Sequence, residues 1–246
     1  MTYPREVIPA WHNDQSNDRM SNPNLSPQVP LKLPTTDKIP ILLATTNPAK
    51  EQAFRWLLEG LALSPMTPAQ LALKDVPPEE GETHDAIARR KAQLWSQAGS
   101  MLAIASDGGL VLPTLGGRWE SRYTHRFAGP AADDAERLAR LLELMRPFQG
   151  AEREASWREA VAIAHRGRII VSWELTGGTG LIADSPGVSY QAPGFWAFSV
   201  WYFPQFGKTY PQLLPEERDS LDDHWTRLRQ LVQRFFRSHF VAPSPE

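Results

Sequence analysis

Apolar runs alternate with amphipathic stretches along the first half of this chain. Residues 39–45 (IPILLAT) are typical of a buried strand, and residues 101–106 (MLAIAS) form a second such run that GLVLPTL continues. Between and before these runs, residues 48–59 and 82–98 repeat apolar side chains at helical spacing. This order predicts strands and helices in alternation, as in a sheet with helices packed against it.

Strand patterns dominate the second half. Residues 130–145 predict another helix, and residues 156–165 and 168–177 predict two strands joined as a hairpin by Arg-Gly-Arg. Two further strands and the last helix are expected at residues 180–184, 195–203 and 215–236. We therefore predict an α/β fold built on a mixed twisted sheet with flanking helices.

The two ends of the chain differ from this middle part. Residues 1–37 contain six prolines and polar clusters without a period of 2 or 3.6, which predicts a flexible or surface-draped extension. We expect one folded domain over residues 38–240 and a short tail over residues 241–246.

Composition excludes several classes of function. The chain of 246 residues has a net charge of −2 and no cysteine, so nothing indicates a nucleic-acid partner, a disulfide or a thiolate-bound metal. No basic start followed by an apolar stretch is visible, and no run approaches the roughly 18 apolar residues of a membrane span. We expect a cytoplasmic protein without a membrane partner.

The turn after the first strand is a candidate anion site. Asn47 suits the N-cap and Pro48 the first turn of the following helix, whose N-terminus carries partial positive charge. Lys50 in the first turn opposes that charge, and an anion at the turn would explain it, with Thr45 as a further donor. The alternative is an ordinary capped helix with an incidental lysine.

Acidic residues at two places could supply a metal site. Asp107 follows a buried strand and precedes two glycines, as a metal ligand or a plain Asp-Gly turn would. Glu79 and Glu80 precede the second helix, where acids are also favoured by the helix dipole. Lys91 shares a helix face with Ile87 and Trp95, which predicts that it is partly buried.

Aromatic residues and the last helix offer weaker signals. Residues 195–203 (FWAFSVWYF) could stack on a base, or form a core strand. His224 and Arg227 could bind a substrate, or lie on a solvated helix face.

The order of these motifs resembles the inosine triphosphate pyrophosphatase family. The family's A-T-x-N-x-x-K matches the turn ending in Lys50, and its D-D-S-G-L-x-V followed by L-G-G resembles SDGGLVLPTLGG. Its Y-S-A-R-Y-x-G resembles YTHRFAG and places Arg126 on the family's arginine. Its G-F-G-Y-D-P resembles GFWAFS, and G-K-T follows at residues 207–209.

Some family positions are changed. Ser106 replaces the first acid of D-D-S-G, and Phe198 replaces the aspartate of the base-recognition segment. Arg218 stands at the family's C-terminal lysine, and only His224 remains of its S-H-R triplet. The phosphate end is therefore largely present, whereas the base end is altered.

The resemblance implies a fold, an activity and a set of roles. The family fold has two lobes around a central cleft, its members hydrolyse non-standard purine nucleoside triphosphates to the monophosphate and pyrophosphate, and they are commonly homodimers. The implied cofactor is Mg²⁺, held by Glu79 or Glu80 together with Asp107. The implied catalytic residues are Asp107 and Lys91. The implied substrate-binding residues are Thr45, Asn47, Lys50, Arg126, Phe195, Trp196, Arg218 and His224.

Two alternatives stay open at this point. The altered base end also fits a diphosphatase with another base specificity. It also fits a weak or inactive relative that binds a nucleotide or a protein, with the extension of residues 1–37 as one means of contact.

Overall fold

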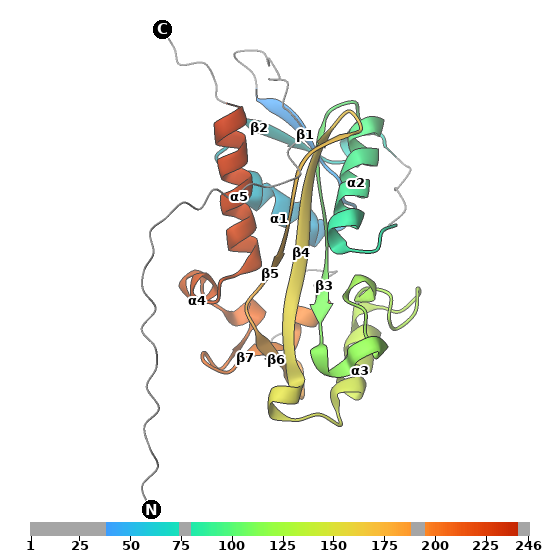
Figure 1. The fold of residues 1–246 in the computed structure, drawn as a ribbon, viewed down its shortest axis with the longest axis vertical. Helices are drawn as coiled ribbons and strands as arrows, with labels where there is room; N and C mark the ends of the chain where they lie inside the picture. Colours follow the sequence, from blue (N-terminus) through green and yellow to red (C-terminus); the bar gives the residue numbers. More distant parts are fainter. Residues whose placement is uncertain (1–37, 74–79, 188–194, 241–246) are drawn as a thin grey trace, which may run out of the picture.

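The computed structural model describes residues 38–73, 80–187 and 195–240, which contain an eight-stranded sheet with helices on both faces (Figure 1). Its strands are β1 (Ile39–Leu43), β2 (Leu63–Met66), β3 (Leu102–Val111), β4 (Glu154–His165), β5 (Arg168–Thr176), β6 (Gly180–Ile182), β7 (Trp201–Phe203) and β8 (Lys208–Thr209). Its α-helices are α1 (Pro48–Leu58), α2 (His84–Ala98), α3 (Asp134–Met145), α4 (Pro215–Ser220) and α5 (His224–His239). The order β2-β1-β3-β4-β6-β7-β8, with β5 also paired to β4, confirms the predicted mixed α/β sheet.

The long strands β3 and β4 form the centre of the molecule. They pair antiparallel over the whole of β3, from Leu102 opposite His165 to Val111 opposite Ser156. The strand β1 pairs parallel with both β2 and β3 but covers only the first part of β3. Beyond Ile104 this edge of β3 pairs with no further strand among the described residues, and side chains such as Lys50 and Thr124 bond its backbone instead. The site described below opens there.

Side-chain size decides how the helices cover the two faces. The face under α2 is lined by alanines such as Ala103, Ala105 and Ala162, all fully buried, and these small residues let the helix approach closely. The opposite face carries larger residues and packs against α1 and α5, which lie together on that side (Figure 1). The helix α3 lies beyond the C-terminal end of β3, at the end of the molecule away from β1 and β2 (Figure 1).

Two sequence predictions in the C-terminal part are wrong. Residues 195–203 do not form one strand, because Trp196–Ser199 is a 3₁₀ helix and only Trp201–Phe203 is extended. The hydroxyl of Ser199 donates to the carbonyl of Trp196 at 2.7 Å, and such local bonds compete with strand pairing.

The last helix is also not continuous. It breaks into α4 and α5 at Asp222, whose φ of 56° is left-handed. Asp223 then caps α5 by accepting a hydrogen bond from the amide of Thr226 at 2.8 Å. The apolar spacing runs through this break, which is why the sequence pattern did not show it.

The sequence pattern also missed the short strands β2 and β8. Pro65 in β2 argues against a strand, but β2 is an edge strand, where a proline is tolerated. The expectations for residues 1–37 and 241–246 lie outside the described residues, so the proposed domain limits stay a prediction.

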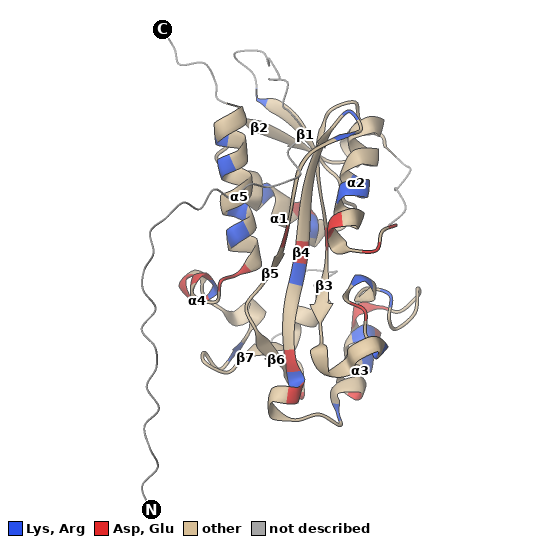
Figure 2. Cartoon of the chain, in the orientation of Figure 1, with Lys and Arg blue, Asp and Glu red and all other residues tan. Residues whose placement is uncertain are grey.

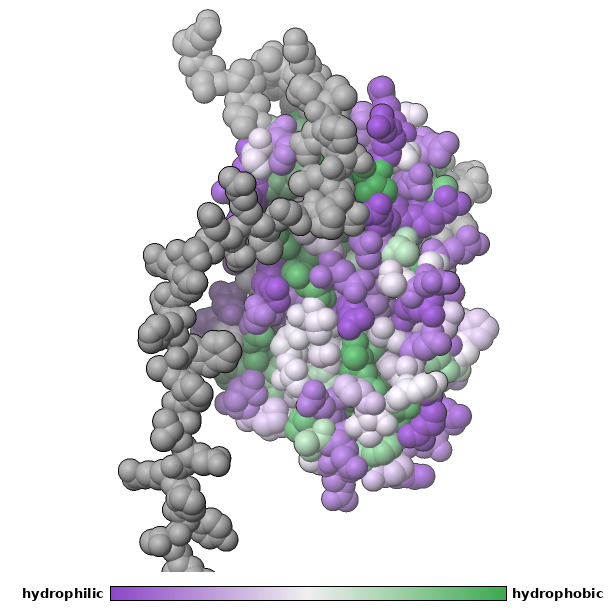
Figure 3. Space-filling view, viewed as in Figure 1, coloured by the Kyte–Doolittle hydropathy of each residue, from purple (hydrophilic) through white to green (hydrophobic). Residues whose placement is uncertain are grey.

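The described part of the chain carries both acidic and basic residues on its surface. Figure 2 shows acidic and basic residues interspersed over the chain, with several basic residues on α5. The face in Figure 3 mixes hydrophilic residues with smaller hydrophobic groups. Within the described ranges, no helix is both long enough and apolar enough to cross a bilayer.

Candidate active site

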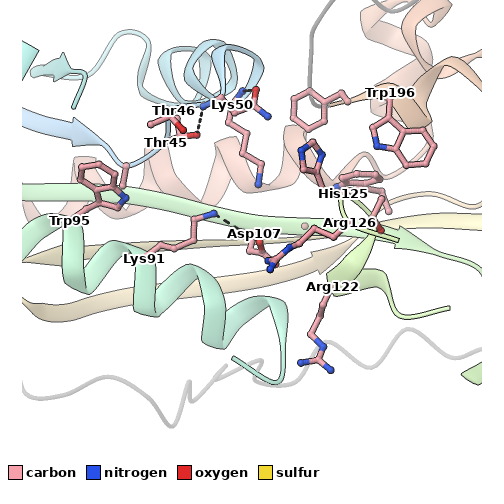
Figure 4. Close-up of a pocket in the computed structure, with 16 residues that line it drawn as sticks. Thr45, Thr46, Lys50, Lys91, Trp95, Asp107, Arg122, His125, Arg126 and Trp196 are labelled. Carbon is pink, nitrogen blue, oxygen red and sulfur yellow. Dashed lines mark hydrogen bonds and ion pairs between the residues drawn. The ribbon is translucent and has the colours of Figure 1, made fainter. Parts of the chain in front are cut away.

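Basic side chains line a pocket of about 220 Å³ next to the end of β1, with Lys50, Lys91 and Arg126 pointing toward Asp107 and Arg122 pointing away (Figure 4). The described lining includes two lysines and two arginines, namely Lys50, Lys91, Arg122 and Arg126, whereas Asp107 is its one carboxylate. The pocket brings together most of the residues singled out from the sequence: Thr45, Asn47, Lys50, Lys91, Asp107, Arg126, Phe195 and Trp196. Its excess of cations favours a polyanionic ligand.

The turn between β1 and α1 is capped by its own side chains. The carboxamide oxygen of Asn47 accepts hydrogen bonds from the amides of Ala49 at 2.9 Å and Lys50 at 3.4 Å. The hydroxyl of Thr45 accepts one from the amide of Asn47 at 3.0 Å. These three amides are therefore already used, and the attraction for an anion at this turn rests on the helix dipole and Lys50.

Asp107 lies at the centre of a short chain of buried polar groups. Its Oδ2 lies 2.6 Å from Nδ1 of His84, and Nε2 of His84 lies 2.8 Å from the hydroxyl of Ser121. With the proton on Nδ1, a neutral His84 donates to Asp107 and accepts from Ser121. The other carboxylate oxygen of Asp107 lies 4.0 Å from Nζ of Lys91, so the histidine orients one side of the carboxylate and the lysine flanks the other.

Lys50 reaches from α1 down to the strands of the sheet. Its Nζ donates to the carbonyl of Ser106 at 3.4 Å and lies 3.7 Å from Oε1 of Glu159, a residue in the middle of β4. The side chain of Lys50 is 14% exposed, so the ammonium forms part of the pocket wall while its contacts lie below the surface. Figure 4 shows Lys50 extending toward Asp107 from α1 above and Lys91 approaching it from α2 at the side.

The two aromatic residues expected to stack on a base line the pocket but are already packed. Phe195 is stacked on Phe198, with ring centroids 4.9 Å apart and an angle of 4° between the planes. Trp196 is stacked on Phe127 with centroids 5.7 Å apart. Phe195 and Trp196 are only 4% and 5% exposed, so each offers a ring edge or part of one face to the pocket.

Arg218 and His224 do not line this pocket. Arg218 stacks on the ring of Tyr210 at 4.8 Å and lines a neighbouring pocket that Phe195 also lines. His224 is fully buried and lines neither of these two pockets. Within the described ranges its ring nitrogens have no hydrogen-bond partner. Burial lowers the pKa of His224 from its ordinary value of 6.5, against the opposing effect of the Asp223 and Glu159 carboxylates.

Sequence reasoning missed three residues of this region, and two of them had a recognisable signal. His84 lies two turns before Lys91 on the same helix, so both point to the same face. Glu159 lies two residues from both Trp157 and Val161, so the three side chains share one face of the strand. Because Trp157 and Val161 are buried, this spacing places a carboxylate on the inward face. Arg122, which lines the pocket and donates to the carbonyl of Gly81 at 2.8 Å, lies in an irregular segment that gives no such pattern.

The donor set fits a hard cation that takes most of its ligands from a substrate. Asp107 presents a carboxylate to the pocket, and magnesium in nucleotide sites is commonly held by one or two carboxylates together with phosphate oxygens and water. Glu80 is exposed and does not line the pocket, and Glu79 lies outside the described residues. No group of three or more histidine or acidic residues placed to hold a metal occurs in residues 38–73, 80–187 and 195–240.

The sequence of this chain is similar to those of known proteins. A family model described as Ham1 family matches residues 41–234. A dITP/XTP pyrophosphatase of Thermus thermophilus is 32% identical over 199 residues, which cover 79% of this chain and 91% of that protein. A dITP/XTP pyrophosphatase of Bacillus subtilis is 27% identical over 190 residues, which cover 77% and 93%.

A solved structure agrees with these sequence matches. The structure of a HAM1 protein from Coxiella burnetii superposes with a TM-score of 0.67 at 26% identity, covering 81% of this chain and 99% of the other. The resemblance to the inosine triphosphate pyrophosphatases that the sequence motifs indicated is thereby confirmed. The chain belongs to the Ham1 family.

Proposed function

We propose that this chain hydrolyses nucleoside triphosphates to the nucleoside monophosphate and pyrophosphate. The observation that carries the proposal is the pocket in which Lys50, Lys91 and Arg126 approach Asp107, the one carboxylate among the described lining residues (Figure 4). A triphosphate matches this arrangement, because its charge needs several cations while its hydrolysis needs one group that accepts a proton. The relatives named dITP/XTP pyrophosphatases support the same reaction class.

The residues divide between charge stabilisation and proton transfer. Lys50 and Lys91 neutralise the phosphate oxygens, and Lys91 also stabilises the charge that develops on the leaving pyrophosphate. Asp107 accepts a proton from the water that attacks the α-phosphorus, while the bond from that phosphorus to the bridging oxygen breaks. His84, at 2.6 Å from Asp107, keeps one carboxylate oxygen engaged so that the other faces the pocket.

Magnesium is the cofactor that fits this proposal. Asp107 would hold it together with phosphate oxygens, with Glu79 or Glu80 as the second acid implied by the family motif. When bound, the ion supplies Lewis-acid polarisation of the phosphates and lowers the pKa of a bound water.

The site is expected to select the triphosphate group strongly but to discriminate only weakly between bases. Phe195 and Trp196 offer apolar contact to a base. The position of the family's base-recognition aspartate is occupied in this chain by Phe198, which is buried. An apolar site discriminates between similar substrates by only about 1–3 kcal/mol, far less than a site that hydrogen-bonds them. Activity on ITP, dITP or XTP is therefore proposed together with activity on other purine triphosphates, and a homodimer stays a prediction.

The test measures pyrophosphate and monophosphate released from ITP, XTP, dITP, GTP, ATP and dUTP in the presence of magnesium. We expect both products in equal amounts, and at least a 10³-fold lower kcat/KM for Asp107→Asn, which corresponds to about 4 kcal/mol. The matched control is Glu143→Gln, an exposed acid on α3 that pairs with Arg140 at 3.1 Å and does not line the pocket.

The outcomes separate the proposal from its alternatives. Release of orthophosphate in place of pyrophosphate would reject the reaction. No turnover of any nucleotide, with binding retained, would favour the non-catalytic relative. A preference for ITP above about 10³-fold would reject weak base selection.

A further inference from the structure

Glu159 is a buried carboxylate that the proposed reaction does not use. It lies in the middle of β4, is fully buried, and does not line the pocket. Burying a carboxylate costs solvation free energy, and a well-packed apolar residue in its place is often neutral or stabilising. Stability therefore does not explain a glutamate at this position, and its contacts point to the neighbouring pocket instead.

The two carboxylate oxygens of Glu159 have different partners. Oε2 accepts a hydrogen bond from the indole nitrogen of Trp157 at 2.8 Å, which fixes the orientation of the carboxylate. Oε1 has no hydrogen-bond partner among the described residues but lies 3.7 Å from Nζ of Lys50. The same Nζ donates to the carbonyl of Ser106 at 3.4 Å, so the ammonium lies between β3 and the carboxylate.

Gly108 provides the space that this carboxylate occupies. Gly108 is paired with Glu159 across the two strands, and a Cβ on Gly108 would lie only 1.8 Å from Oε2. Any side chain at residue 108 would therefore displace the carboxylate from its place beside Lys50. The glycine is required for space, because its backbone is not in the left-handed region.

Lys50 is the cation that neutralises Glu159. The other titratable group that acts on the carboxylate from α5 is His224, whose pKa burial lowers, so that its ring is neutral at pH 7. In the part of the chain that the structure describes, Glu159 thus has Lys50 as its charged partner in the pocket wall, while the nearby His224 is neutral.

We propose that Glu159 is a positioning residue that holds the Lys50 ammonium against β3. The inference rests on the proposed function, since it assigns to Lys50 a fixed place at the phosphates. A lysine held in this way stabilises the charge that develops on the phosphate in the transition state. It cannot move to make its best contact with the bound substrate in the ground state. Without the carboxylate, Lys50 is free to bind the ground state more tightly while stabilising the transition state less.

The test replaces Glu159 by glutamine, which keeps the volume and the acceptor for Trp157 but removes the charge. We expect the KM for the best nucleotide to fall at least threefold and kcat to fall about tenfold, a combination that simple loss of folded protein does not produce. An unchanged KM and kcat, or a raised KM, would overturn the proposal.

A binding experiment judges the inference independently of catalysis. Inorganic tripolyphosphate is titrated calorimetrically, without metal, into the parent and into Glu159→Gln, Lys50→Gln and the double variant. We expect at least threefold tighter binding by Glu159→Gln, and no difference between Lys50→Gln and the double variant. Equal tightening in the Lys50→Gln background would overturn the proposal, because the effect would then not pass through Lys50.

The two experiments also separate this inference from the proposed function. If the parent binds tripolyphosphate in a Lys50-dependent way but releases no pyrophosphate from any nucleotide, the proposed function fails while the calorimetric cycle still decides the role of Glu159. Thermal unfolding of each variant, with a midpoint near that of the parent, establishes that folded protein is compared in every case.

Discussion

The two ends of the site use their side chains in opposite ways. At the phosphate end, ionisable groups approach one another at a pocket wall, with Asp107 between His84 and Lys91 and with Lys50 above Glu159. At the aromatic end, Phe195, Phe198, Trp201 and Tyr210 stack mainly on each other, and His224 is buried among them. The first arrangement leaves charge available to a ligand, whereas the second uses aromatic area to stabilise the fold.

Because of this difference, we expect substitutions at the phosphate end to change the catalytic rate and substitutions at the aromatic end to change the stability of the fold. A substitution at the phosphate end removes a charge that faces the pocket and changes few packed contacts. A substitution at the aromatic end leaves a cavity in the core but does not alter the charges around Asp107. The following predictions are ordered by the free energy that each change is expected to cost.

The largest effect is expected from truncation in the aromatic end. Phe198 is 1% exposed and is stacked on Phe195, so Phe198→Ala should lower the free energy of unfolding by about 3–5 kcal/mol. Measured at a temperature where the variant is folded, kcat/KM for ATP should stay within about threefold of the parent. Urea unfolding and steady-state kinetics check the two halves of this prediction, and a large loss of kcat/KM in folded protein would show that the two ends are coupled.

A smaller cost, confined to rate, is expected at the phosphate end. Lys91→Gln removes the cation 4.0 Å from Asp107 and should lower kcat/KM about 100-fold, equivalent to about 2.7 kcal/mol, with little change in stability. Lys208→Gln is the matched control, because Lys208 pairs with Glu217 at 2.7 Å and does not line the pocket. Equal kinetics for the two variants would contradict the role of Lys91.

The smallest effect concerns pH and His224. Because burial lowers the pKa of His224 in the folded state below the ordinary 6.5, the unfolded chain binds a proton first as the pH falls. This histidine should therefore destabilise the fold below pH 6.5, by at most about 1.4 kcal/mol per pH unit, and not above it.

The matched variant is His224→Leu, which cannot titrate and leaves no unsatisfied ring nitrogen. Urea unfolding at pH 7.5 and 5.5 should give the parent a larger loss of stability on acidification than the variant. The same pH dependence for both proteins would mean that His224 does not titrate during unfolding in this range.

Local pattern predicted much of this molecule. The strand that begins at Ile39, the helix that Asn47 caps, and the hairpin of β4 and β5 all follow from short-range spacing and turn residues. The grouping of Lys50, Lys91 and Asp107 followed from a family resemblance, because three separate elements carry these residues and no single stretch specifies their meeting.

The contacts that could not be predicted depend on packing between distant segments. The bond between His84 and Asp107 joins α2 to β3, and the pair of Lys50 and Glu159 joins α1 to β4. The break before α5 depends on a left-handed Asp222 that the apolar spacing does not show. Each of these features is set by which elements pack together, so the sequence of any one element is insufficient.

The central claim is that water attacks the α-phosphorus of a nucleoside triphosphate in the pocket around Asp107. Hydrolysis of ATP or ITP in water enriched in oxygen-18, followed by mass spectrometry of both products, tests it directly. We predict the label in the nucleoside monophosphate and none in the pyrophosphate. Label in the pyrophosphate, or labelled orthophosphate as the main product, would contradict the account.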